Sequence, residues 1–384
     1  MRILHTADWH IGRRLGRHDR TEEMRDALDE VARIADEEQV DLVLVAGDVF
    51  DRATPPVESL SLGLTALLRL ARGRPVVVVA GNHDAPELFD ALAPLLRDRG
   101  VHLIGRIRAP NAGGVLGPDE LGVPSVVAGF PFLREGRVID FMAETGTWYG
   151  TYAQRIAALT DAYNTALVER AGTDLIPILV AHFMVNGVRV SRSERELHIG
   201  DAYTATAQAI PAGPQYVALG HIHAPQPVPG APVPAAYAGS LLAMDFGEAG
   251  ETKRVVIVDA EPGRLATLRS VPIEAGRPLE QVRGTWDEVA ARADALVDRY
   301  LDLTISVGGP DPDLGRRAAA LFPYLVRVRA ERPAQARRER SAEARPSDDD
   351  LYAGFVRATT GEDPPAALVQ LFRDTMEEVA DAAS

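Results

Sequence analysis

Acidic, amide and imidazole side chains recur at five places in the first 225 residues, each directly after a short apolar run. The candidate ligands in these places are Asp8, His10, Asp48, Asn82, His182, His221 and His223. One such motif alone is weak evidence, because a His-x-His pair also occurs in ordinary hydrogen-bonded turns. Seven side chains of this kind at the ends of predicted strands are typical of a metal site.

The chain contains no cysteine, which excludes thiolate ligands, disulfides and a cysteine nucleophile. Imidazole together with carboxylate and amide oxygen suits Mn²⁺, Fe or Zn²⁺ better than Ca²⁺ or Mg²⁺. Seven ligands are more than one ion requires. The set therefore predicts two ions that share one bridging carboxylate and lie roughly 3.5 to 4 Å apart.

The elements that must position these side chains are predicted from apolar runs at residues 3–6, 42–46, 76–80, 178–181 and 217–219. Such β-branched runs alternate with longer amphipathic segments, one of which begins near Thr21, and this alternation indicates a layered α/β domain. The carboxyl ends of strands in an open α/β sheet form its ligand-binding crevice, so the five motifs can converge. Residues 237–244 and 254–259 resemble strands without a helix between them, which predicts a second, more antiparallel sheet.

The last third of the chain changes in character. Helical patterns at 286–301 and 316–321 alternate with strand patterns at 304–307 and 325–329, which indicates a small α+β unit. Two amphipathic helices follow a segment rich in Arg, Glu and Ala. The predicted organisation is a large α/β domain at 1–270, an α+β domain at 271–330, a linker at 331–346 and a helical tail at 347–384 that needs a partner surface.

The order Asp-x-His, Gly-Asp-x-x-Asp, Gly-Asn-His-Asp, His, Gly-His-x-His resembles that of the calcineurin-like metallophosphoesterases. The resemblance implies a four-layer α-β-β-α sandwich with a small α+β capping domain and a helical C-terminal tail. It also implies that one ion is held by Asp8, His10, Asp48 and His223, and the other by Asp48, Asn82, His182 and His221. Asp48 is then the bridging ligand.

The same resemblance gives His83 and Asp84 catalytic roles. His83 would donate to the phosphate oxygens or the leaving group without being a ligand, and Asp84 would orient its ring. The implied reaction is in-line hydrolysis of a phosphoester by an activated water. The chain has neither a Gly-x-Ser-x-Gly elbow nor a Walker A motif, so nothing in the sequence supports a serine nucleophile or ATP hydrolysis.

Longer stretches are similar to the SbcD family of nucleases within that superfamily, namely residues 1–12, 45–56, 131–134, 193–195 and 218–226. This similarity implies a DNA exonuclease and endonuclease that cuts ends and hairpins with Mn²⁺ in DNA repair, recombination and replication. It further implies an SbcC-type coiled-coil ATPase as partner, a homodimer within a heterotetramer, and DNA contact by the α+β domain. The tail at 347–384 would bind the ATPase.

The formal net charge of -14 argues against a broadly electropositive surface, so DNA contact must be local or shared with the partner. Candidate phosphate contacts are Arg13, Arg14, Arg17 and Arg20 after the first motif and Arg189, Arg192 and Arg195 after the fourth. Solvated surface arginines are the alternative. Trp9 is expected to pack in the core.

Two other functions stay open at this point. The chain could act on small phosphoesters, nucleotides or phosphoproteins, or it could be a non-catalytic scaffold of the ATPase complex. No apolar run is long enough to cross a membrane and no signal sequence is evident, so a cytoplasmic protein is expected.

Overall fold

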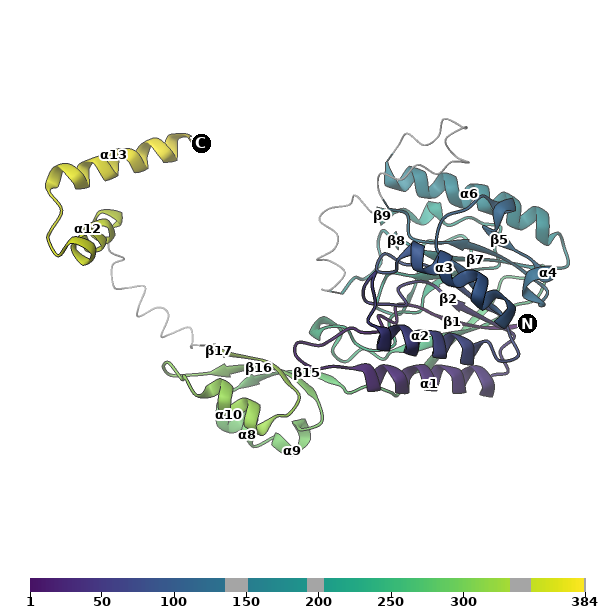
Figure 1. Ribbon diagram of the computed structural model, residues 1–384, viewed down its shortest axis with the longest axis horizontal. Coiled ribbons are helices and arrows are strands. Elements are labelled where there is room, and N and C mark those ends of the chain that lie inside the picture. Colours follow the sequence, from purple (N-terminus) through teal and green to yellow (C-terminus); the bar gives the residue numbers. More distant parts are fainter. Residues whose placement is uncertain (135–150, 192–203, 332–346, 383–384) are drawn as a thin grey trace.

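A computed structural model of the chain describes residues 1–134, 151–191, 204–331 and 347–382 (Figure 1). Two of the candidate arginines, Arg192 and Arg195, and nearly all of the predicted linker lie outside these residues. No helix in the described ranges is long and apolar enough to cross a membrane.

The first of two large sheets has six strands and carries the first three ligand motifs. Its order is β14 (Thr267–Pro272), β13 (Arg254–Asp259), β1 (Arg2–Thr6), β2 (Leu42–Val45), β3 (Val76–Val79) and β4 (Val101–Ile104). Strands β1 to β4 are parallel, whereas β13 and β14 are antiparallel to their neighbours. The ends of β1, β2 and β3 therefore point to one edge.

The second sheet also has six strands and carries the last two motifs. Its order is β11 (Gln226–Pro227), β12 (Ala235–Tyr237), β10 (Tyr216–Gly220), β7 (Ile176–His182), β6 (Ser125–Phe130) and β5 (Val115–Leu116). The central strands β12, β10, β7 and β6 are parallel.

Helices cover the outer face of each sheet. Helices α1 (Thr21–Glu37), α2 (Val57–Leu70) and α3 (Pro86–Leu96) lie on the first sheet, and α6 (Tyr152–Ala171) lies on the second. Along β2, Val43 and Val45 pack toward the helices, while Leu42 and Leu44 pack between the sheets. Strands buried on both faces read as continuous apolar runs, which is why they were visible in the sequence. The predicted four-layer sandwich is confirmed.

Two details of the predicted second sheet are wrong. The expected strand at 237–244 is not formed, since β12 covers Ala235–Tyr237 and ends at the first residue of that range. The expected strand at 254–259 is β13, but it pairs antiparallel with β1 in the first sheet. Apolar alternation identifies a strand without identifying its neighbour. The second sheet is consequently mostly parallel.

The α+β unit is a parallel sheet of β15 (Leu279–Gly284), β16 (Tyr300–Ser306) and β17 (Leu325–Glu331). Helices α8 (Trp286–Ala290), α9 (Ala293–Leu296) and α10 (Leu314–Leu321) cover one face (Figure 1). The boundary expected at residue 270 falls inside β14, because that strand continues to Pro272 as the edge of the first sheet.

This unit is attached to α1 by a polar cluster around Glu23. The hydroxyl of Tyr300 donates to Oε1 of Glu23 at 2.6 Å, and Arg277 donates to the same oxygen at 3.0 Å. Arg20 donates to Oε2 at 2.9 Å. The guanidinium of Arg277 also lies 3.5 Å from the ring centre of Tyr324. These contacts tie the segment after the first ligand motif to the α+β unit.

The tail consists of α12 (Asp348–Thr360) and α13 (Ala366–Ala382). The hydroxyl of Ser347 accepts the N–H of Asp350 as expected from the capping box. The rings of Tyr352 and Phe372 stack with centres 4.2 Å apart, and Arg373 forms an ion pair with Asp349. Apolar side chains stay exposed on both helices, among them Leu351, Phe355, Leu368, Leu371 and Met376.

The remaining elements are short and connect these layers. They are α4 (Pro118–Leu121), β8 (Met184–Val185), β9 (Thr204–Ala205), and the 3-10 turns η1 (Arg97–Arg99), η2 (Pro110–Ala112), η4 (Ala207–Ala209) and η5 (Phe246–Glu248).

Candidate metal centre

The backbone turns sharply where the motifs leave their strands. Five non-glycine residues among those described have positive φ, and four of them are predicted ligands: Asp8, His10, Asp48 and His221. This left-handed conformation is costly for residues with a side chain and concentrates at functional sites. At these four residues the left-handed backbone coincides with side chains that lie in the ligand groups.

Glycines precede Asp48, Asn82 and His221 because other atoms of the site approach the backbone closely at these positions. A Cβ at Gly81 would lie 2.1 Å from Oδ1 of Asp48, and one at Gly220 would lie 1.9 Å from the carbonyl oxygen of Ala46. Glycine is the residue that permits such an approach. The Gly-Asn and Gly-His steps of the motifs are therefore packing requirements as well as turns.

One group of side chains joins the ends of β1 and β10. Ligand atoms of Asp8, His10 and His223 lie within 4.8 Å of one another. Nε2 of His10 lies 3.1 Å from Nε2 of His223. The carboxylate of Asp8 also accepts the backbone N–H of His221 at 2.9 Å, which fixes its orientation.

A second group joins the ends of β2, β7 and β10, and ligand atoms of Asp48, His182 and His221 again lie within 4.8 Å. Oδ1 of Asn82 is 3.0 Å from Nε2 of His182 and 2.8 Å from Nδ1 of His221. Those two ring nitrogens are 3.2 Å apart. All seven predicted ligands are thus brought together in two adjacent groups.

Asp48 lies between the groups. Its Oδ2 is 3.6 Å from Nε2 of His10 and 3.4 Å from Nε2 of His182. Its Oδ1 accepts the backbone N–H of His83 at 2.8 Å. The carboxylate is therefore held by the Asn-His-Asp turn and faces both groups with one oxygen.

The donor set fits divalent cations. Nδ1 of His182 is 2.7 Å from the carbonyl oxygen of Ala46, and because a carbonyl only accepts, Nδ1 carries the proton. Once a cation displaces the second proton of this ring, the neutral imidazole directs its Nε2 lone pair at the space shared with Asp48, Asn82 and His221. Several lone pairs converge on each group with too few protons between them, and a cation resolves this repulsion.

The buried charges perturb one another strongly. Burial raises the pKa of Asp8 to about 7, against the positive charges of His182 and His223. Burial alone would lower the pKa of His182, but Asp48 outweighs it and raises that pKa to about 9. Burial holds the pKa of His10 well below its usual value. Without a cation, protons occupy part of the ligand set.

Asp84 does not have the predicted contact with the ring of His83. Its carboxylate accepts the backbone N–H groups of Val49, Phe50 and Gly81 at 3.2, 3.0 and 2.9 Å. Burial, with the charge of Asp48, still raises the pKa of Asp84 to about 6. The carboxylate is thus bonded to these three N–H groups instead of the His83 ring, and through them Asp84 holds the turns that carry Asp48 and His83.

The ring of His83 is oriented by a backbone carbonyl. Its Nδ1 lies 2.9 Å from the carbonyl oxygen of Asp51, so Nδ1 is the donor. The ring lies edge-on to that of His10, with centres 4.7 Å apart. His83 is thus beside the ligand groups, and the Gly-Asp-x-x-Asp spacing that includes Asp51 was the available signal for its partner.

The arginines after the first motif have different environments. Arg20 is only 5% exposed and is bonded to Glu23 and to the carbonyl oxygen of Ala243, so its predicted contact with DNA is wrong. Arg13 forms an ion pair with Asp51 at 3.2 Å, beside the site. Arg189 forms an exposed ion pair with Glu251. Trp9 is buried and donates to the hydroxyl of Thr6, as expected for a core residue.

Four residues that the sequence reasoning missed also adjoin the ligands. Phe132 stacks on His221 with ring centres 5.8 Å apart, and Arg134 donates to the carbonyl oxygens of Asn82 and Asp84. Glu248 and Lys253 lie behind His223. Phe132 and Arg134 both belong to the stretch 131–134 that resembles SbcD, whereas no motif contains Glu248 or Lys253.

The comparisons with known proteins agree with this site. Residues 1–225 match the calcineurin-like phosphoesterase family, and residues 275–355 match a family described as type 5 capsule protein repressor C-terminal domain. The SbcD subunit of the SbcCD nuclease from Bacillus subtilis (strain 168) is 36% identical, covering 97% of each chain. The corresponding subunits from Rhodobacter capsulatus and Escherichia coli (strain K12) are 34% and 30% identical, covering 87% and 88% of this chain and 81% and 87% of theirs.

The matched family covers more than half of the chain and includes all seven predicted ligands, and the Bacillus relative aligns over nearly the whole of it. The chain therefore belongs to the calcineurin-like metallophosphoesterases and, within them, to the SbcD family of metal-dependent nucleases.

Proposed function

We propose that this chain cuts DNA as a two-metal double-strand exonuclease and a hairpin and single-strand endonuclease. The observation that carries the proposal is the position of Asp48 Oδ2, which lies 3.6 Å from His10 and 3.4 Å from His182 and so faces both ligand groups. A single carboxylate oxygen between two sets of imidazoles is suited to bridge two ions.

Asp8, His10, Asp48 and His223 would hold one ion, and Asp48, Asn82, His182 and His221 the other. Mn²⁺ is the proposed metal in both sites. The donors combine nitrogen and oxygen without sulfur, which suits Mn²⁺, Fe or Zn²⁺, and the similarity to SbcD nucleases favours Mn²⁺ among them. When bound, the ions supply an activated water and neutralise the oxygens of the scissile phosphate.

His83 is proposed to act as the general acid for the leaving group or as a hydrogen-bond donor to the phosphate oxygens. With Nδ1 committed to the carbonyl oxygen of Asp51, the ring has Nε2 left to act on substrate. The contacts of Asp84 support a positioning role, because its carboxylate joins the turn of His83 to the turn of Asp48. Hydrogen bonds within the chain thus orient the ring of His83 and hold the two turns together.

The α+β domain offers a basic surface for the DNA backbone. On the sheet face opposite α8 and α10, Asp302 is buried and pairs with Arg327 and Arg329 at 2.6 and 3.1 Å. Arg283 lies in the same row of the sheet as Arg329; its side chain is 71% exposed and forms an ion pair with Glu331 at 3.1 Å. One carboxylate between two guanidinium groups leaves donors for phosphate oxygens, so we place a DNA contact here.

The tail helices are the proposed attachment to an SbcC-type coiled-coil ATPase, because their exposed apolar side chains suit a helix-binding groove. The relatives' name describes each of them as one subunit of the SbcCD nuclease. A homodimer within a heterotetramer is the assembly that we propose, in the cytoplasm, where chromosomal DNA is accessible.

The test compares cleavage of end-labelled linear and hairpin duplexes with hydrolysis of a phosphodiester dye, each with Mn²⁺. His83→Ala should lower DNA cleavage by about 10²–10⁴-fold. His102→Ala, on β4 and outside the ligand groups, is the matched histidine control and should retain activity. If the dye is hydrolysed while DNA stays intact even with an SbcC-type ATPase added, the proposed substrate is wrong and a small-molecule phosphoesterase is favoured.

A further inference from the structure

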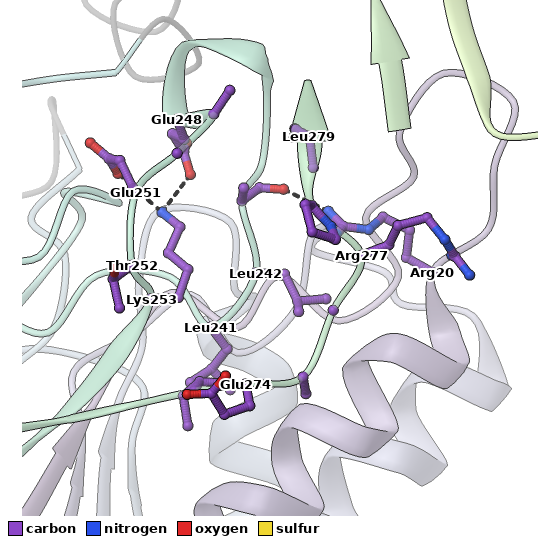
Figure 2. A pocket seen from close by; sticks show the side chains of 17 residues that line it. Arg20, Leu241, Leu242, Glu248, Glu251, Thr252, Lys253, Glu274, Arg277 and Leu279 are labelled. Carbon is purple, nitrogen blue, oxygen red and sulfur yellow. Dashed lines mark hydrogen bonds and ion pairs between the residues drawn. The ribbon is translucent and has the colours of Figure 1, made fainter. Parts of the chain in front are cut away.

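Lys253 is the single lysine of the chain, since the other members of its 41 basic residues are arginines. It precedes β13 and its side chain is only 6% exposed. Nζ donates to Oε2 of Glu248 at 2.6 Å and to Oε2 of Glu251 at 3.4 Å (Figure 2). It also donates to the carbonyl oxygen of His223 at 3.0 Å. Three N–H groups thus meet three acceptors.

Glu248 connects this lysine to the metal centre. It closes η5 and is fully buried. Its Oε1 lies 3.3 Å from Nδ1 of His223, while its Oε2 also accepts the backbone N–H of Met244 at 3.0 Å. The opposite nitrogen of His223, Nε2, is the one that faces His10. A continuous chain therefore runs from Lys253 through Glu248 to a predicted ligand.

The geometry has two physical consequences for His223. A carboxylate only accepts, so Glu248 favours the tautomer with the proton on Nδ1 and leaves the Nε2 lone pair facing the ligand group. The lysine is bonded to both the backbone and the carboxylate partner of His223. It therefore fixes the ring at two points.

The chemistry also explains why this position is not arginine. An ammonium group is a compact charge whose three donors diverge from one atom, whereas a guanidinium is a wide planar fork. The three acceptors surround a single point. Lys253 also lines a cavity of about 370 Å³ whose lining includes Arg20 and Arg277 (Figure 2). A buried carboxylate without a cation is costly, so Lys253 compensates Glu248.

We propose that Glu248 and Lys253 are positioning residues that set the tautomer and orientation of His223 for one of the two metal sites. This rests on the proposed role of His223 as a ligand, and it goes beyond that role by separating the two sites. Of the two groups, the one that contains His223 depends on the pair. Among the described residues, Glu248 makes no contact with the group of Asp48, His182 and His221.

The test is calorimetric titration of the metal-free full-length protein with Mn²⁺, for wild type, Glu248→Gln, Lys253→Arg and Glu251→Gln. Glu248→Gln and Lys253→Arg should each weaken one of two binding events by about 10–100-fold and leave the other unchanged. Glu251→Gln removes the longest contact of the same ammonium group without touching His223, and it should bind within about twofold of wild type at both sites. Melting temperatures in EDTA provide the folding control.

The outcomes separate this inference from the proposed function. A wild type that binds no Mn²⁺ contradicts the proposed function itself. Wild-type binding of two ions with unchanged affinities in Glu248→Gln overturns the positioning role, as does equal weakening of both events together with a lower melting temperature in EDTA.

A measurement on the wild type covers the case in which the variants do not fold. In metal-free protein labelled with ¹⁵N-histidine, the ring signal assigned to His223 should show the Nδ1–H tautomer instead of the Nε2–H form that predominates in a free imidazole. The Nε2–H form would overturn the inference.

Discussion

Nε2 of His10 lies 3.1 Å from Nε2 of His223, although 213 residues of sequence separate them. Two imidazole nitrogens at this distance can share one proton at most, and each ring has its other nitrogen directed away. Asp8 completes the group with carboxylate oxygens. The fold therefore brings several nitrogen and oxygen lone pairs together in a buried site. This arrangement is destabilising without a cation and favourable when a cation is bound.

Replacement of the bridging carboxylate tests how the two groups depend on each other. We expect Asp48→Asn to weaken binding of both ions and to lower phosphodiester hydrolysis by more than about 100-fold. Loss of a ligand shared by two ions should reduce activity more than loss of a residue that only orients a ligand. Asp8→Asn should weaken one binding event only. Mn²⁺ calorimetry on both variants is the measurement, and an Asp48→Asn variant that binds two ions normally would contradict the shared ligand.

Metal binding should strengthen as pH rises from 6 to 9. In the metal-free protein, burial raises the pKa of Asp8 to about 7, while at His182 the charge of Asp48 outweighs burial and raises the pKa to about 9, so at neutral pH Asp8 is partly protonated and His182 mostly so. A cation must displace these protons, and higher pH removes them beforehand. Calorimetry in two buffers of different ionisation enthalpy should detect proton release, and affinity that is flat across this range would argue against protonated ligands.

Loss of the contact between α1 and the α+β unit should lower DNA cleavage more than it lowers hydrolysis of the phosphodiester dye. Glu23→Gln removes the charge shared by Tyr300, Arg20 and Arg277, and we expect a loss of about 1–3 kcal/mol in the free energy of unfolding. DNA cleavage should fall more than dye hydrolysis.

Glu22→Gln is the matched control for this prediction, because Glu22 lies on the same helix, is 80% exposed and pairs only weakly with Arg25 at 3.5 Å. Urea unfolding and both activity assays give the answer. Equal losses of the two activities in Glu23→Gln would contradict a role of this contact in presenting DNA.

The tail should be needed for the partner and dispensable for chemistry. Phe355→Asp or Leu371→Asp places a charge among the exposed apolar side chains of α12 and α13, so binding to a purified SbcC-type ATPase should be lost. Arg357→Asp, on another side of α12, is the control. Co-purification with the ATPase is the measurement, and dye hydrolysis should be unchanged in every variant. Retained binding in both apolar variants would contradict a role of the tail in the interface.

The sequence was most informative where buried strands end in polar residues. Runs such as Val76–Val79 are apolar on both faces, so the strand and the position of Asn82 after it could be predicted together. The order of motifs then indicated the family. The rule that parallel strands present their carboxyl ends at one edge grouped the first three motifs and, separately, the last two. Asp8 and His223 follow strands of different sheets, so their convergence depends on how the two sheets pack against each other.

Side-chain partners could not be predicted in the same way. The carboxylate of Asp84 is taken by backbone N–H groups of a turn near position 50, and Arg20 is buried by a contact with Glu23 of the next helix. Glu248 and Lys253 reach His223 through a 3-10 turn that follows no motif. Periodicity records burial and hydrogen-bond partners across elements only indirectly, so these residues required the structure.

The central claim is that two ions lie on either side of Asp48. Anomalous diffraction from crystals soaked in Mn²⁺ tests it most directly. We expect two peaks roughly 3.5 to 4 Å apart, one beside Asp8, His10 and His223 and the other beside Asn82, His182 and His221, with Oδ2 of Asp48 between them. A single peak, or peaks that do not contact Asp48, would contradict it.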